Sequence, residues 1–143
     1  MTTPTPENEV LPVGSEDDVV RVRQAVRRHA ITLGFSLVDQ TKLVTAASEL
    51  ARNVLIHGLG GQVRLEPLPV PISGARPGLR PGLRMVFEDQ GPGIPDLDRA
   101  LQDGFTTGNG LGLGLSGSRR LMNEFSVESR PGETRITVVK WKA

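Results

Sequence analysis

The chain has 143 residues, a length that suits one domain and excludes two of full size. Hydrophobic residues make up 37% and charged residues 23%, a globular profile that excludes disorder throughout, and a formal charge of +1 provides no global field to recruit nucleic acid or an acidic membrane surface. The absence of cysteine excludes disulfides and thiolate-bound zinc, and two histidines leave little room for a histidine metal site, so a bound metal is expected to have oxygen ligands.

The first elements are a tail, a strand and two helices. Residues 1–9 are expected to be a flexible tail ahead of one domain over residues 10–143, and Pro12 predicts that the strand around it lies at a sheet edge. A first helix is predicted from its Ser15 cap to Gly34, and a second from its Ser36 cap to Gly58, because apolar residues recur at 3.6-residue spacing in both.

The remaining elements are shorter. Apolar residues that alternate with polar ones predict strands over 62–68, 83–89, 125–129 and 134–141. A helix that contains Leu121 and Met122 is predicted over 115–124. A Pro- and Gly-rich insertion over 67–82, which repeats Arg-Pro-Gly-Leu, predicts a long mobile hairpin connection. This order predicts an α+β fold, a two-layer α/β sandwich with helices on one face of a mixed, mainly antiparallel sheet.

Three polar residues of the second helix lie at i, i+4 and i+8, namely Glu49, Asn53 and His57. This spacing puts Glu49 and Asn53 on one helix face, opposite the apolar stripe. A carboxylate can accept a proton, and an amide oxygen is a hard ligand suited to Mg²⁺. The same spacing also fits a solvated polar face, and His57 is assigned a structural role.

Two glycine-rich segments follow. Asp89 ends a strand directly before Gly91 and Gly93, which allow the backbone to approach a ligand closely, although an ordinary turn would read the same way. The alternating Gly and Leu residues of 108–114 precede a helix, where backbone N–H groups can bind phosphate oxygens. A Rossmann site is excluded because no strand precedes these glycines, and a P-loop is excluded because no Gly-Lys-Ser/Thr follows them.

Together these motifs resemble the GHKL ATP-binding superfamily. Within it, the chain is similar to the small bacterial anti-sigma-type serine/threonine kinases, and most similar to the RsbT-like switch kinases of stress signalling. The resemblance covers about residues 8 to 141, and its motifs come in the family's order. They are SELARN (48–53), EDQGPGIP (88–95), DGFTT (103–107), GLGLGL (110–115) and RLMNEF (120–125).

This resemblance implies ATP and Mg²⁺ as cofactors and a role for each matching residue. Glu49 would be the catalytic base, Asn53 the Mg²⁺ ligand, and Asp89 the acceptor for the adenine amine in a pocket shaped by Gly91 and Gly93. The remaining nucleotide-binding positions would be Thr107 in the lid over 105–109, the phosphate-binding run Gly110, Leu111, Gly112, Leu113 and Gly114, and Thr134. The last position departs from the family pattern, since Gly132-Glu133-Thr134 is one residue shorter than the usual Gly-x-Gly-Thr.

The resemblance also implies protein partners. STAS-domain antagonist or scaffold proteins would be the substrates, with partner switching that regulates a sigma-factor or stress-response pathway. The alternatives are a kinase that itself sequesters a sigma factor, and a nucleotide-dependent binding module that activates a phosphatase of the PP2C type. A sensor histidine kinase is excluded, because 143 residues leave no room for its dimerising hairpin, and His29 is expected at the surface. Neither nucleic acid nor a membrane is expected as a partner, and a cytoplasmic location is expected, because no apolar run could span a bilayer and the polar start lacks signal-peptide features.

Overall fold

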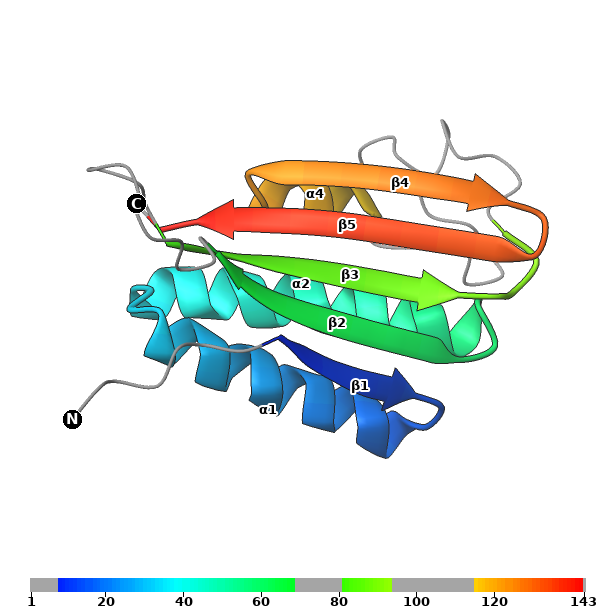
Figure 1. Ribbon diagram of the computed structural model, residues 1–143, viewed down its shortest axis with the longest axis horizontal. Helices are drawn as coiled ribbons and strands as arrows, with labels where there is room; N and C mark the ends of the chain where they lie inside the picture. The colour runs from blue at the N-terminus through cyan, green and yellow to red at the C-terminus, as the bar shows by residue number, and fades with distance from the viewer. Residues whose placement is uncertain (1–7, 69–80, 94–114, 143) are drawn as a thin grey trace.

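The computed structural model describes residues 8–68, 81–93 and 115–142. In these ranges a sheet is covered on one face by three helices, which lie behind the sheet in Figure 1. The elements, in chain order, are β1 (Glu9–Val13), α1 (Glu16–Thr32), α2 (Leu37–Ile56), β2 (Gly61–Leu68), β3 (Gly82–Asp89), α4 (Leu115–Leu121), β4 (Glu124–Arg130) and β5 (Glu133–Trp141).

The sheet has the strand order β1-β2-β3-β5-β4, and every described pair of neighbouring strands is antiparallel. The α+β sandwich is therefore confirmed, with a sheet that is antiparallel rather than mixed in the part of the chain described. Strand β1, which contains Pro12, lies at one edge as predicted, where a residue without an N–H is tolerated.

Both long helices begin at the predicted caps. The Ser15 side chain accepts a hydrogen bond from the Asp18 N–H, and the Ser36 side chain accepts one from the Asp39 N–H. Helix α1 packs beside α2, and together they bury an aliphatic core against the sheet, with Leu43, Leu50 and Phe87 among its largest fully buried side chains.

Three boundaries differ from the sequence-based prediction. Glu9, assigned to the tail, begins β1 and pairs with Leu65 of β2. The insertion predicted over 67–82 is shorter at both ends, because residues 67, 68 and 82 are strand residues, while 69–80 lie outside the described residues. Helix α4 ends at Leu121 and not at residue 124, because the Asn123 N–H bonds to the Val139 carbonyl and the chain then turns into β4.

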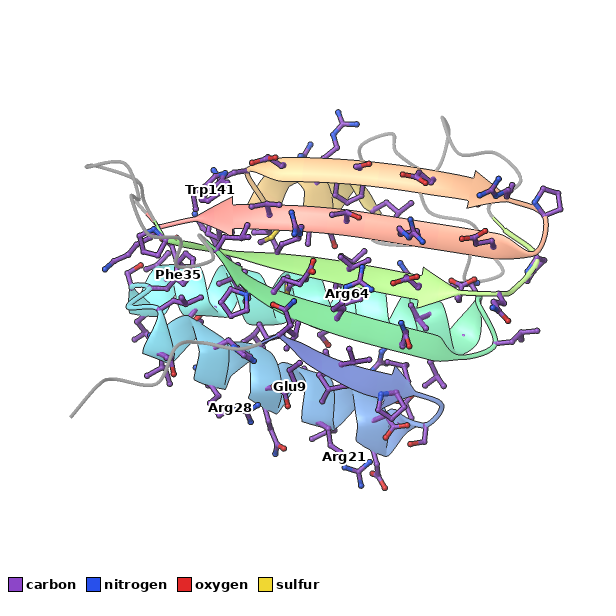
Figure 2. The ribbon with its side chains drawn as sticks, in the orientation of Figure 1. Glu9, Arg21, Arg28, Phe35, Arg64 and Trp141 are labelled. Carbon is purple, nitrogen blue, oxygen red and sulfur yellow. The ribbon has the colours of Figure 1, made fainter. Side chains whose placement is uncertain are left out.

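Glu9 also holds α1 against the edge of the sheet. Its carboxylate accepts hydrogen bonds from Arg28 and from His29 Nε2, the latter at 2.9 Å, and Figure 2 shows Glu9 and Arg28 side by side. The expectation that His29 lies at the surface is wrong, since its side chain is 11% exposed. Burial acts to raise the pKa of Glu9, but the bonds from His29 and Arg28 outweigh it and hold that pKa below its usual range.

The sheet face that the helices leave uncovered carries a run of ion pairs. It includes Arg64, labelled in Figure 2. Oppositely charged side chains alternate across four strands, with N–O distances from 2.7 to 3.9 Å, in the order Arg84, Glu66, Arg64, Glu88, Arg135, Glu133 and Arg130. Single exposed pairs contribute little stability, but a network of them keeps this face polar and leaves most of its charges paired.

Candidate functional site

A small cavity lies between the helices and the sheet, at the end where α2 and β3 terminate. Its lining comes from α2, the residues after it, β3 and the turn after it, the start of α4, and β5. The lining residues are Asn53, Val54, His57, Gly58, Asp89, Gly93, Leu115, Thr134 and Ile136. The structure thus brings together four residues singled out in the sequence: Asn53, Asp89, Gly93 and Thr134.

Asp89 is the last residue of β3, and its side chain is partly buried beside the end of α2. Its Oδ1 accepts a hydrogen bond from the Gly91 N–H at 3.0 Å. Burial raises the pKa of Asp89, and the Gly91 bond offsets part of that rise. A partly desolvated carboxylate among apolar residues is a strong acceptor for a ligand N–H.

Thr134 is the residue opposite Asp89 in the antiparallel register of β3 and β5. It is 5% exposed, and its Oγ1 lies 2.9 Å from Ser129 Oγ of β4. A carboxylate and a hydroxyl therefore meet in the cavity between the aliphatic side chains of Val54, Leu115 and Ile136. Apolar walls with a few convergent polar groups are typical of ligand sites, and this carboxylate and hydroxyl suit a ligand that carries an N–H donor.

Close backbone packing fixes this end of the site. A Cβ at Gly58 would lie 2.3 Å from Asp89 Cγ, and a Cβ at Gly91 would lie 2.7 Å from the Gly58 carbonyl oxygen. Gly93 has a φ of +87°, in the left-handed region that favours glycine. Gly58 and Gly91 are therefore required by the approach of the β3 turn to the end of α2, whereas Gly93 is required by its φ and by the nearby Arg130 carbonyl of β4.

Glu49 lies one helical turn before Asn53 and is exposed, outside the cavity lining. The described residues contain no cluster of three or more His, Asp or Glu that could hold a metal ion by itself. The Asn53 amide is a single hard oxygen donor, which fits a cation that takes most of its other ligands from a bound phosphate and water.

Five lining residues are not identified as such from the sequence, namely Val54, His57, Gly58, Leu115 and Ile136. The three aliphatic ones carry only a core pattern, whereas the other two have a more specific place in the site. His57, assigned a structural role, reaches the cavity from the end of α2, and Gly58, assigned only as a helix stop, packs on Asp89. For His57 the spacing of four residues from Asn53 was an available signal. The predicted positions Gly110, Leu111, Gly112, Leu113, Gly114 and Thr107, together with the lid over 105–109, lie outside the described residues.

Sequence comparison finds a matching family model and several similar individual proteins. Residues 38–143 match the family described as histidine kinase-, DNA gyrase B-, and HSP90-like ATPase. The chain is 47% identical over 128 residues to the serine/threonine-protein kinase RsbT of Bacillus subtilis (strain 168), which covers 89% of this chain and 91% of that protein. It is 29% identical over 123 residues to the anti-sigma F factor of Thermoanaerobacter sp. (strain X514), with 83% and 82% covered.

Solved structures support the fold. The RsbU and RsbW domains of Rv1364c from Mycobacterium tuberculosis align with a TM-score of 0.60 at 19% identity, covering 96% of this chain and 32% of that one. A chain of the SiaB-SiaC complex from Pseudomonas aeruginosa aligns with a TM-score of 0.55 at 13% identity, covering 96% and 90%. Among the described helices, none combines the length and apolar character needed to cross a bilayer.

Proposed function

Because the chain belongs to the histidine kinase-, DNA gyrase B-, and HSP90-like ATPase family, we propose that its cavity binds ATP with Mg²⁺ and that it phosphorylates a serine or threonine of a partner protein. The 47% identity to a serine/threonine-protein kinase over most of both chains supports the kinase activity. We propose STAS-domain proteins as the substrates, and exchange of partners on phosphorylation as the means by which the kinase regulates a sigma-factor pathway.

The observation that carries the proposal is the pairing of Asp89 with Thr134 in the apolar slot beneath Asn53. The Asp89 carboxylate is suited to accept a hydrogen bond from the adenine amine, with the Thr134 hydroxyl beside it. Val54, Leu115 and Ile136 would exclude water from the faces of the base. A guanine carries a carbonyl where adenine carries its amine, so the Asp89 carboxylate would repel it.

Asn53 and Glu49 share one face of α2 but differ in accessibility, which suits two different roles. Asn53 lines the cavity and would hold Mg²⁺, whose charge neutralises the triphosphate. Glu49 is exposed, so a hydroxyl on another protein can reach its carboxylate. Gly110, Gly112 and Gly114 are the residues that we propose to bind the phosphates, together with Leu111, Leu113 and Thr107 in the same segment.

The reaction moves one phosphoryl group between two oxygens. The seryl or threonyl oxygen forms a bond to the γ-phosphorus while the bond from that phosphorus to the ADP oxygen breaks. The hydroxyl proton passes to the Glu49 carboxylate, which orients the hydroxyl before transfer. Phosphoryl transfer depends mainly on positioning and charge neutralisation, so no covalent protein intermediate is needed.

A second candidate function is direct binding of a sigma factor by this kinase. The 29% identity to an anti-sigma F factor over most of both chains favours it. The two functions differ in the partner retained: a switch kinase releases its phosphorylated substrate, whereas an anti-sigma factor forms a lasting complex with a sigma subunit. Pull-down with the purified sigma factors of the source organism separates them.

Calorimetric titration tests the nucleotide site. ATP, ADP and GTP are each titrated with Mg²⁺ and then with EDTA, with Asp89→Asn as the matched variant. Adenine-selective binding that depends on Mg²⁺ and is lost in Asp89→Asn is the expected result. Binding of GTP as tight as that of ATP, or no binding of any nucleotide, contradicts the proposal.

A further inference from the structure

A buried lysine lies at the end of the sandwich opposite the cavity, next to Trp141, which is labelled in Figure 2. Lys140 of β5 is 7% exposed, and its ammonium group faces two helices. Its Nζ donates a hydrogen bond to the Leu121 carbonyl at the end of α4 (3.2 Å), and it lies 3.7 Å from Asp39 Oδ1 in the first turn of α2. A buried ammonium is unfavourable unless it is paired in this way.

The three elements that meet at Lys140 also line the cavity. Helix α2 contributes Asn53, α4 contributes Leu115, and β5 contributes Thr134. Lys140 lies on the same face of β5 as Thr134, about 20 Å along the strand at ~3.4 Å per residue. Asp39 precedes Asn53 by about 21 Å of helix at ~1.5 Å per residue. Lys140 therefore connects α2, α4 and β5 at the end of the sandwich away from the cavity.

Helix α4 depends on such contacts for its position. It runs only from Leu115 to Leu121, and a helix of two turns has little stability of its own. Its C-terminal end is held on β5 by three bonds: the one from Lys140, one from the Asn123 N–H to the Val139 carbonyl, and one from the Trp141 N–H to Asn123 Oδ1. A cation at this end also interacts favourably with the helix dipole.

We propose that Lys140 is a positioning residue for the nucleotide site. Its ammonium group fixes the spacing of α2 and α4 at one end, and so fixes where Leu115 stands relative to Asn53 at the other. Loss of this charge lets α4 shift, and nucleotide affinity falls although no residue that lines the cavity has changed. This inference rests on the nucleotide site proposed above.

The test compares Lys140→Met, which keeps the length of the side chain but not its charge, with Lys140→Arg, which keeps the charge. Lys142→Met removes a charge two residues away and is the matched control. Val26→Ala, a core truncation in α1 away from the cavity, is the control for a general loss of stability. Asp39→Asn removes the partner carboxylate, and a double-mutant cycle with Lys140→Met measures their coupling.

Two measurements are made on each variant. Amide hydrogen exchange without nucleotide reports the protection of residues 115–121, and calorimetry reports the Kd for ATP with Mg²⁺. Lys140→Met is expected to lower the protection of α4 and to weaken nucleotide binding about tenfold, within the range of typical coupling energies. Lys140→Arg, Lys142→Met and Val26→Ala are expected to bind nucleotide within about threefold of the wild type.

The outcomes separate this inference from the proposed function. Unchanged α4 protection and affinity in Lys140→Met overturn the inference, as does an equal loss of affinity in Val26→Ala. If the wild-type protein binds no nucleotide, the proposed function fails, and the exchange data alone then decide whether Lys140 positions α4. If α4 is less protected in Lys140→Met and regains its protection in Lys140→Arg, then Lys140 positions α4, whether or not the protein binds nucleotide.

Discussion

Asp89 and Thr134 occupy one register position on adjacent antiparallel strands, so their side chains enter the cavity together. The two residues are 45 positions apart in the sequence, and each stands at the end of its strand nearest the cavity. The Gly132-Glu133-Thr134 turn is shorter than the family pattern, yet the register of β5 still places Thr134 opposite Asp89. This arrangement supports the adenine-side role that we propose for Thr134.

Replacement of Asp89 by asparagine is expected to separate stability from binding. The pKa of Asp89 is raised by burial, so the ionised carboxylate destabilises the folded state at pH 7, and that penalty is relieved as pH falls through the raised pKa. Asp89→Asn should therefore unfold at higher urea than wild type at pH 7, with the difference vanishing at acidic pH. Its affinity for ATP should fall by roughly 10- to 100-fold. A variant that loses stability at pH 7 would show that burial of Asp89 is not the dominant effect.

Thr134→Val tests the hydroxyl beside Asp89. Valine keeps the shape of threonine, so the core under β5 should stay packed while the bond to Ser129 Oγ is lost. We expect roughly tenfold weaker ATP binding, the size of one hydrogen bond of about 1 kcal/mol or slightly more. Calorimetry on Thr134→Val and Thr134→Ser measures it, and the serine variant should bind as the wild type does. Equal affinity in all three proteins would exclude Thr134 from the nucleotide contact.

Gly58→Ala is expected to block the cavity by moving Asp89. The added methyl group would lie 2.3 Å from Asp89 Cγ, so the carboxylate must shift. Gly117→Ala is the matched control, because a Cβ there meets nothing within 4 Å and its position is helical. We expect Gly58→Ala to lose ATP binding and Gly117→Ala to retain it, with a gain in stability of about 0.5–1 kcal/mol. Normal ATP affinity in Gly58→Ala would mean that the position of Asp89 does not matter.

Glu49→Ala and Asn53→Ala should fail in different ways. Glu49→Ala is expected to bind ATP with normal affinity but to transfer phosphate at least ~100-fold more slowly, the usual contribution of a general base. Asn53→Ala is expected to lose the Mg²⁺-dependent part of nucleotide binding. Calorimetry and transfer of labelled phosphate to a STAS-domain partner distinguish the two. Phosphorylation at the normal rate by Glu49→Ala would refute its role as the base.

Glu9→Gln is expected to weaken the attachment of β1 to α1 in a pH-dependent manner. The folded-state pKa of Glu9 is lowered, so its stabilising contribution is present above the unfolded pKa of about 4.3 and is lost as pH falls through the folded value. We expect Glu9→Gln to lose about 0.5 kcal/mol at pH 7, a value typical of a partly exposed pair, and less below about pH 4. Urea unfolding at each pH measures this difference, and a difference that grows toward low pH would contradict the assignment.

Local sequence patterns predict the helices and strands, because caps, glycines and apolar spacing act within a few residues of each element. The Ser15 and Ser36 caps and the alternation in β2 and β3 gave the order of helices and strands, from which the layers followed. The bond between Glu9 and His29 could not be predicted in this way, since it joins residues 20 apart on a strand and a helix. The end of α4 was misplaced for the same reason, because the bond from Asn123 to Val139 depends on tertiary packing.

Site residues could be predicted where a side chain has a chemical role of its own. They could not be predicted where a residue lines the cavity only because of how the chain packs. Asp89 was recognised as a carboxylate before a glycine turn, and Asn53 as an amide on a polar helix face. Gly58 was assigned only as a helix stop, although its lack of a side chain makes room for Asp89. His57 shares the four-residue spacing with Asn53, but its place in the cavity also depends on where α2 ends, which the spacing does not decide.

The pairing of Leu68 with Gly82 closes the β2–β3 ladder at the end of the sheet away from Asp89, about 24 Å from it at ~3.4 Å per residue. Each of the two strands is also anchored by a second neighbour, β2 by β1 and β3 by β5, so the register of the ladder does not depend on the connection alone. A fluorescent label placed here therefore lies far from the nucleotide cavity but beside Lys140 and Trp141, so it can report on the end of the sheet that Lys140 holds.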